Sequence, residues 1–186
     1  MRTTTMCLAA AVLLTFMAIG APADDAKSDG QRLQESKAKW SKVQEDCGGN
    51  YRYFISHSNF VGAGNETEVV VRGGKVAGRR YREFGPIPAA PPPPGEEPPK
   101  IEYKWVEQGD KVGSHKEGAP AETLDELYAR AEKVAAAELE PTQKRYVRFD
   151  QQGLLMSCYY VDTRIADDAP TTGVIVSSIK IEKPAP

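Results

Sequence analysis

Residues 67–84 read TEVVVRGGKVAGRRYREF, the clearest strand–turn–strand pattern in the chain. Residues 67–72 are rich in β-branched side chains, which favour strands. Gly73 and Gly74 then provide the positive backbone φ angles that a two-residue hairpin turn needs. Residues 75–84 return as a second strand, so this stretch predicts an antiparallel hairpin.

Strand patterns on both sides of this hairpin extend it into a sheet. Residues 51–58 alternate, so that Tyr51, Tyr53 and Ile55 share one face of a strand. Further strand patterns occupy residues 101–105, 146–150, 154–161 and 173–181. The turns between most neighbouring strands are short, and short turns join antiparallel strands.

A first helix is predicted before the sheet. Residues 31–46 carry Leu33, Trp40 and Val43 on one stripe of a helix, and Gly48 follows as a stop signal. The stripe is thin, so this helix is expected to lie on a surface of the sheet.

A second helix begins at a capping box. The Thr123 hydroxyl can accept a hydrogen bond from the backbone three residues on, and Glu126 can reach back to Thr123. Apolar residues then recur at helical spacing as far as Leu139, and Pro141 ends the helix.

These patterns predict an α+β fold, an antiparallel sheet of about six to seven strands with both helices packed on one face. We expect one domain over residues 31–182, preceded by a flexible polar tail at residues 24–30. Residues 85–100 hold eight of the fourteen prolines, and proline lacks the N–H that a strand ladder needs. A proline-rich loop insertion is therefore predicted there. Its Pro-x-x-Pro spacing also fits a ligand for a proline-reading partner, but such readers are mainly intracellular, so a semi-rigid loop is preferred.

Residues 1–23 have the pattern of a cleavable signal peptide. Arg2 gives the start its one positive charge, residues 7–19 are almost wholly apolar, and small residues precede the cut. Cleavage is predicted between Ala23 and Asp24. The apolar run is too short for a stable membrane anchor. The sequence therefore predicts a periplasmic or secreted protein with no membrane insertion after cleavage.

The predicted compartment indicates which cysteines remain in the chain and whether they pair. Cys7 lies within the signal peptide, so Cys47 and Cys158 remain in the mature chain. Two cysteines in an oxidising compartment most often pair. The sequence predicts a disulfide between Cys47 and Cys158, which would tie the end of the first helix to a late strand. Two separate buried thiols are the alternative.

Six short motifs follow one another in a recognisable order. They are Trp40, Tyr51-Arg-Tyr53, residues 69–76, Thr123-Leu-Asp-Glu-Leu-Tyr128, Phe149-Asp150 and Ile165-Ala-Asp-Asp168. In this order the chain resembles a family of small exported bacterial domains known only as a domain of unknown function, often found in lipoproteins. The resemblance implies an extracytoplasmic α+β domain and carries over no catalytic residues. The family's close-spaced cysteines at the end of the first strand are replaced here by Ser56-His-Ser-Asn59, so any disulfide must be arranged differently.

No pattern of catalytic, cofactor-binding or metal-binding residues stands out. His57 and His115 are the two histidines, and neither belongs to a His-Glu-x-x-His pair. Asp162, Asp167 and Asp168 lack the alternating oxygens and bidentate glutamate of a calcium loop, so a solvated turn is the preferred interpretation. The sequence therefore predicts neither a cofactor nor an enzyme. A formal net charge of −2 gives no reason to expect nucleic-acid binding.

Seven aromatic residues are candidates for a binding face. They are Tyr51, Tyr53, Tyr81, Tyr103, Trp105, Tyr159 and Tyr160. Tyrosine and tryptophan suit binding surfaces because a large ring ends in a polar tip, but the same residues can fill the space between sheet and helices. We expect a non-catalytic binding module for an unknown envelope or extracellular protein. An inhibitor-like module that acts on a secreted or envelope enzyme is the alternative, motivated by the proline-rich loop.

Overall fold

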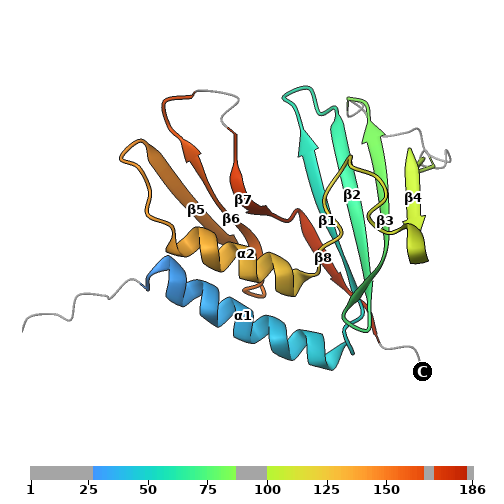
Figure 1. Cartoon of the computed structure of the whole chain (residues 1–186), viewed down its shortest axis with the longest axis horizontal. Helices are drawn as coiled ribbons and strands as arrows, with labels where there is room; N and C mark the ends of the chain where they lie inside the picture. Colours follow the sequence, from blue (N-terminus) through green and yellow to red (C-terminus); the bar gives the residue numbers. More distant parts are fainter. Residues whose placement is uncertain (1–26, 87–99, 166–169, 184–186) are drawn as a thin grey trace, which may run out of the picture.

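The computed structural model describes residues 27–86, 100–165 and 170–183 (Figure 1). Its elements in chain order are α1 (Asp29–Asp46), β1 (Tyr51–Ser58), β2 (Gly64–Arg72), β3 (Lys75–Phe84), β4 (Trp105–Gln108), the 3-10 turn η1 (Gly109–Lys111), α2 (Leu124–Ala136), β5 (Gln143–Phe149), β6 (Leu155–Asp162), β7 (Thr172–Ile175) and β8 (Ser178–Ile181). All strand pairs are antiparallel. The predicted α+β class is confirmed.

The strands form two sheets, where the sequence predicts one. The larger sheet has the order β4-β3-β2-β1-β8, and the smaller has the order β5-β6-β7. The division falls within the last predicted strand, residues 173–181. Its first half, β7, pairs with β6, whereas its second half, β8, pairs with β1. The chain therefore passes from one sheet to the other between these two short strands (Figure 1).

Ser177 marks the point where the two sheets separate. Its N–H donates to the Phe54 carbonyl at 2.7 Å, and its Oγ accepts from the Ser56 N–H at 2.8 Å. The register of β1 with β8 ends at the Phe54–Ser178 pair. Beyond this point β1 and β7 diverge, as the two groups of strands do in Figure 1.

The two helices lie side by side, below both sheets in the view of Figure 1. α1 begins at Asp29 because a capping box joins Ser28 and Gln31, so its first two residues fall within the predicted tail of residues 24–30. α2 has the predicted capping box at Thr123 and Glu126. It ends at Ala136, three residues before Leu139.

Buried hydroxyl groups connect the helices to the strands. The Tyr51 hydroxyl accepts from the Leu124 N–H at 3.0 Å, which fixes the start of α2 against β1. The Tyr128 hydroxyl lies 2.7 Å from Ser36 Oγ on α1 and accepts from the Leu155 N–H at 2.9 Å. One side chain thus joins α1, α2 and β6. Both tyrosines are fully buried.

The predicted strand at residues 101–105 is displaced along the chain. β4 begins at Trp105, which lies opposite Tyr81 on β3. Lys104 makes the preceding contact, because its N–H donates to the Tyr81 carbonyl at 2.8 Å. Residues 101–103 form no strand in the structure.

Several predictions from the sequence fall outside the described residues. They concern the signal peptide at residues 1–23, the cut between Ala23 and Asp24, most of the proline-rich segment, and Asp167 and Asp168.

Candidate functional site

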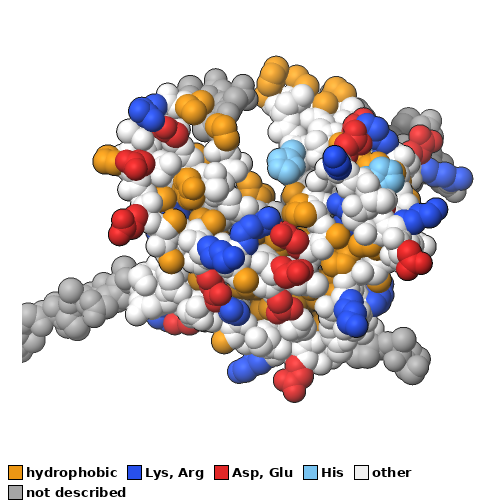
Figure 2. Space-filling view, viewed as in Figure 1, with side chains coloured by type: hydrophobic (Ala, Val, Ile, Leu, Met, Phe, Trp, Pro, Cys, Tyr) orange, Lys and Arg blue, Asp and Glu red, His pale blue; other side chains and the backbone are white. Residues whose placement is uncertain are grey.

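A cleft of about 400 Å³ opens between the two sheets, where β1 and β7 separate. Figure 2 shows the surface hollowed there. Strands β1 to β3 supply one wall, β7 supplies the opposite wall, and α2 and residues 118–120 contribute the rest. The lining includes the side chains of Ile55, His57, Thr67, Tyr81, Arg130 and Ile175. We call this the inter-sheet cleft.

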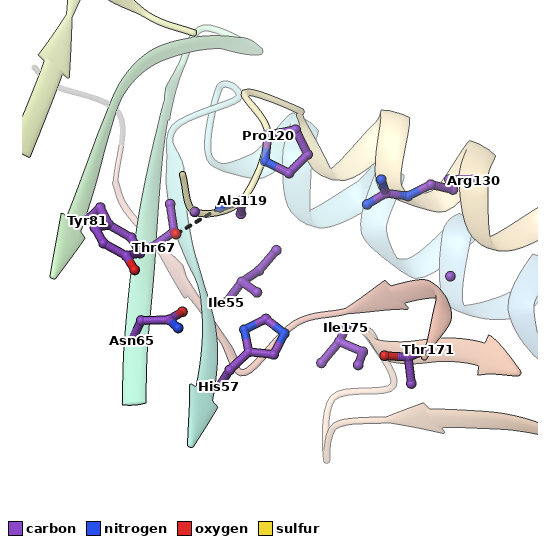
Figure 3. Close-up of a pocket in the computed structure, with 12 residues that line it drawn as sticks. Ile55, His57, Asn65, Thr67, Tyr81, Ala119, Pro120, Arg130, Thr171 and Ile175 are labelled. Atoms are coloured by element: carbon purple, nitrogen blue, oxygen red, sulfur yellow. Dashed lines mark hydrogen bonds between the residues drawn. The ribbon is translucent and has the colours of Figure 1, made fainter. Parts of the chain in front are cut away.

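The cleft brings together residues that are far apart in the sequence. His57 on β1 and Ile175 on β7 face each other across it (Figure 3). Asn65, the neighbour of His57 in the β1–β2 register, lines the same wall. A mixed polar and apolar lining of this kind is typical of binding sites.

Arg130 brings a positive charge to the cleft from α2. Its Nη2 lies 3.0 Å from Glu122 Oε2, and its side chain is 37% exposed. Its Nε is buried and has no hydrogen-bond partner among the described residues. The exposed part of this guanidinium can contact a ligand in the cleft, whereas the buried Nε is out of a ligand's reach.

The loop at residues 118–120 is fixed against the larger sheet. Thr67 Oγ1 accepts from the Ala119 N–H at 2.9 Å (Figure 3). Gly118 has φ +77°, and a Cβ there would lie 2.5 Å from Thr67 Oγ1. Only glycine adopts this positive φ readily and lacks the Cβ that would displace the loop. This wall of the cleft is therefore held in one position.

A buried ion pair holds the preceding part of the same loop. Arg79 on β3 donates to Glu107 on β4 through Nε at 2.8 Å and Nη2 at 2.9 Å. The two side chains are 2% and 0% exposed. Glu107 also accepts from the Gly113 N–H at 2.7 Å, from Ser114 Oγ at 3.1 Å and from His115 Nδ1 at 2.9 Å.

These contacts determine the charge state of Glu107. Burial alone would raise the pKa of its carboxyl group. The hydrogen bonds from Arg79, from the backbone of His115 and Gly113, and from the His115 ring outweigh this effect and hold the pKa of Glu107 well below its ordinary value of 4.5. Glu107 is therefore an anion over the physiological pH range.

Ser114, His115 and Glu107 are of the residue types found in a catalytic relay, but their geometry differs from one. In a relay the histidine contacts the acid through one ring nitrogen and the nucleophile through the other. Here Nδ1 of His115 makes both contacts, at 2.9 Å to Glu107 and 3.4 Å to Ser114. The His115 ring also stacks on Trp105 with centroids 4.6 Å apart. The cluster thus fits a structural role in holding the loop.

The seven aromatic candidates do not form one exposed face. Tyr51, Tyr53, Tyr81 and Trp105 are buried. Their position supports the alternative that such residues fill the core, and the interpretation of a seven-membered aromatic face is wrong. Tyr103, Tyr159 and Tyr160 are partly exposed.

The predicted disulfide is corrected to two separate buried thiols. Cys158 Sγ lies 3.4 Å from the carbonyl of Ala131 on α2. The helices run antiparallel, and Gln34 on α1 hydrogen-bonds Glu132, the residue after Ala131. Cys47 lies thirteen positions beyond Gln34, and a rise of 1.5 Å per residue gives a separation of about 20 Å. A disulfide needs Cα atoms within about 7 Å.

The turn between β1 and β2 exposes an apolar tip. Phe60 is fully exposed and Val61 is 48% exposed. Asn59 fixes the turn, since its Oδ1 accepts from the N–H groups of Val61 and Ala63, each at 3.1 Å. A large side chain is thus presented to solvent on a hydrogen-bonded loop.

Within the described part of the chain, no three side chains of His, Cys, Asp or Glu gather as metal ligands do. None of its helices is long and apolar enough to cross a membrane.

Comparison of the chain with models of protein families, with curated proteins and with solved structures finds no match. The resemblance to an exported bacterial family therefore rests on the quoted motifs alone.

Three residues of the site were not singled out from the sequence. Arg79 and Glu107 carry a signal in the strand alternation, because Arg79 shares a face with Tyr81, and Glu107 shares one with Trp105. A charge on a buried face needs a partner of opposite charge, which pairs these two residues. Arg130 has no such signal, since its role depends on how α2 packs.

Proposed function

We propose that this chain is an exported, non-catalytic binding module that holds a protein of the cell envelope or the extracellular space in its inter-sheet cleft. The existence of this cleft, lined by both sheets and α2, is the observation that carries the proposal. The signal-peptide pattern of residues 1–23 supports export.

The fixed wall supports binding as well. Residues 113–119 are held by Glu107, Arg79 and Thr67 through hydrogen bonds to backbone and side chain. A wall that keeps its position loses little conformational freedom when a partner binds. The cleft is therefore organised before binding.

A pair of tryptophan substitutions tests the proposal. His57→Trp would fill the cleft, whereas Arg148→Trp places the same ring at an exposed position on β5, outside the cleft. The proteins are immobilised, and the polypeptides that each retains from the host's envelope fraction are quantified by mass spectrometry. We expect the wild type and Arg148→Trp to retain a common partner that His57→Trp loses. Equal retention by all three proteins, or no specific retention by any, would contradict the proposal.

The apolar tip favours a second candidate, the inhibitor-like module. Inhibitors of secreted enzymes present an exposed side chain on a loop of fixed conformation, and Phe60 has both properties. This function predicts that the protein lowers the activity of a hydrolase in the host's secreted fraction and that Phe60→Ala abolishes the effect. Unchanged hydrolase activity with the wild-type protein would remove this candidate.

A further inference from the structure

The inter-sheet cleft is bordered on one side by an open edge of β1. β8 pairs with β1 only over residues 51–54. The Ser56 N–H then reaches Ser177 Oγ at 2.8 Å. Alternate residues of a strand direct their N–H groups to the same side, so the Ser58 N–H also points away from β2. In the described chain no strand pairs with this edge.

The other side of the cleft is an open edge of β7. The Val176 N–H donates to the Met156 carbonyl on β6 at 2.7 Å. By the same alternation, the N–H groups of Gly173 and Ile175 point away from β6 and toward the cleft. Both residues line it. Of the strands described, β7 pairs with β6 alone.

The outward N–H groups of Ser58 on β1 and of Gly173 and Ile175 on β7 thus point into the space between the two strands, whereas the Ser56 N–H already has Ser177 Oγ as its acceptor. A polypeptide in the extended conformation has donors and acceptors on both of its sides. Placed in the cleft, it would pair with both strands and join the two sheets into one. An exposed sheet edge is a known docking place for an added strand.

The charge of the cleft indicates what side chain such a segment carries. None of the described residues that line the cleft is Asp or Glu. Arg130 is the one charged residue among those that line it, and its side chain is 37% exposed. Glu122 pairs with the same guanidinium at 3.0 Å but does not line the cleft. A carboxylate on the bound segment would contact the exposed part of the guanidinium.

We infer that the occupant of the inter-sheet cleft is an extended, acidic polypeptide segment of a partner protein, which binds as a strand between β1 and β7. This inference rests on the proposed function and specifies its partner by backbone conformation and charge.

Backbone methylation of a peptide tests the two-sided pairing. Random decapeptides displayed on phage are selected on the wild-type protein, and the best binder is synthesised in two further forms, N-methylated at alternate residues in the odd or the even positions. A strand between two edges uses both sets of N–H groups, so we expect each form to bind at least tenfold more weakly. If binding of only one form is weakened, the peptide adds to a single edge and the two-sided pairing is wrong. If binding of neither form is weakened, or if no peptide is selected, the inference that the segment binds as a strand is wrong altogether.

A matched pair of arginine substitutions tests the charge. Arg130→Gln removes the guanidinium from the cleft, whereas Arg148→Gln removes one from an exposed position on β5. We expect Arg130→Gln to weaken the selected peptide about tenfold and to have no effect on the same peptide with its acidic residues changed to Asn or Gln. Equal effects of the two variants would overturn the acidic part of the inference.

The outcomes separate this inference from the proposed function. If His57→Trp abolishes partner retention while the methylation pattern is one-sided or absent, the cleft binds a partner in another form and only strand addition fails. If His57→Trp changes neither partner retention nor peptide binding, the proposed function fails too.

Discussion

Replacing Glu107 with glutamine is expected to remove a large part of the stability of the fold. Glutamine keeps the shape of the side chain but turns one acceptor oxygen into a donor, and it leaves the Arg79 guanidinium, 2% exposed, without its counter-charge. Breaking a buried ion pair in this way costs about 3–5 kcal/mol. The backbone N–H groups of Gly113 and His115 also lose an anionic acceptor. We therefore expect Glu107→Gln to lower the free energy of unfolding by about 3–5 kcal/mol.

Urea unfolding followed by circular dichroism measures this difference. Glu83→Gln is the matched control, because Glu83 pairs with Lys104 at 2.9 Å on the exposed surface, where both side chains are about half exposed. Exposed pairs contribute little, so the control is expected to unfold at the same urea concentration as the wild type. A loss below about 1 kcal/mol for Glu107→Gln would mean that the pair is effectively solvated. The reasoning about the fixed wall of the cleft would then be wrong.

Three further predictions concern pH, the core and the thiols. The pKa of Glu107 is lower in the folded protein than its ordinary value of 4.5, so its stabilising effect is complete above about pH 4.5 and is lost as the pH falls toward the folded-state value. In urea titrations, the difference in unfolding free energy between wild type and Glu107→Gln should therefore narrow over that acidic range. A constant difference would contradict this prediction. Tyr128→Phe removes the acceptor of the buried Leu155 N–H, so we expect the free energy of unfolding to fall by about 1–3 kcal/mol in the same assay. An unchanged free energy of unfolding would show that this N–H finds another partner. A chain of residues 24–186, kept without reductant, should show two reactive thiols after denaturation and none before it. Cys47 and Cys158 are separate and buried, and burial raises the pKa of the Cys158 thiol. No reactive thiol after denaturation would restore the disulfide.

Local signals predicted most of the elements. The hairpin at residues 67–84 and the capping box at Thr123 and Glu126 are both present, because a two-residue turn and a cap depend on a few neighbouring residues. The start of α1 was predicted two residues late, since the Ser28–Gln31 box was not recognised. Its signal is in the sequence.

The division into two sheets has no comparable local signal. Residues 173–181 read as one strand, and the change of partner depends on Ser177 meeting Phe54 and Ser56, more than a hundred residues away. The disulfide prediction failed for a similar reason. Pairing statistics for exported proteins carry no information on the helix register that separates Cys47 from Cys158.

The cleft itself was beyond the reach of sequence patterns. It exists because His57 and Ile175 lie on strands that diverge beyond Ser177, and this divergence depends on contacts between segments far apart in the sequence. The alternation of β1 identifies which residues share a face but does not identify which edge stays open. Charge pairing on buried faces was the one usable signal, and it leads to Arg79 and Glu107.

Amide hydrogen exchange gives the most direct test that the inter-sheet cleft binds an extended chain. The exchange rates of the N–H groups of Ser58, Gly173 and Ile175 are measured by NMR with and without the selected peptide, and amides of β4 and β5 serve as references remote from the cleft. We expect all three rates to fall at least tenfold in the complex while the reference rates stay the same. Unchanged rates at these three amides in a saturated complex would show that the peptide binds elsewhere and that the cleft is not the site.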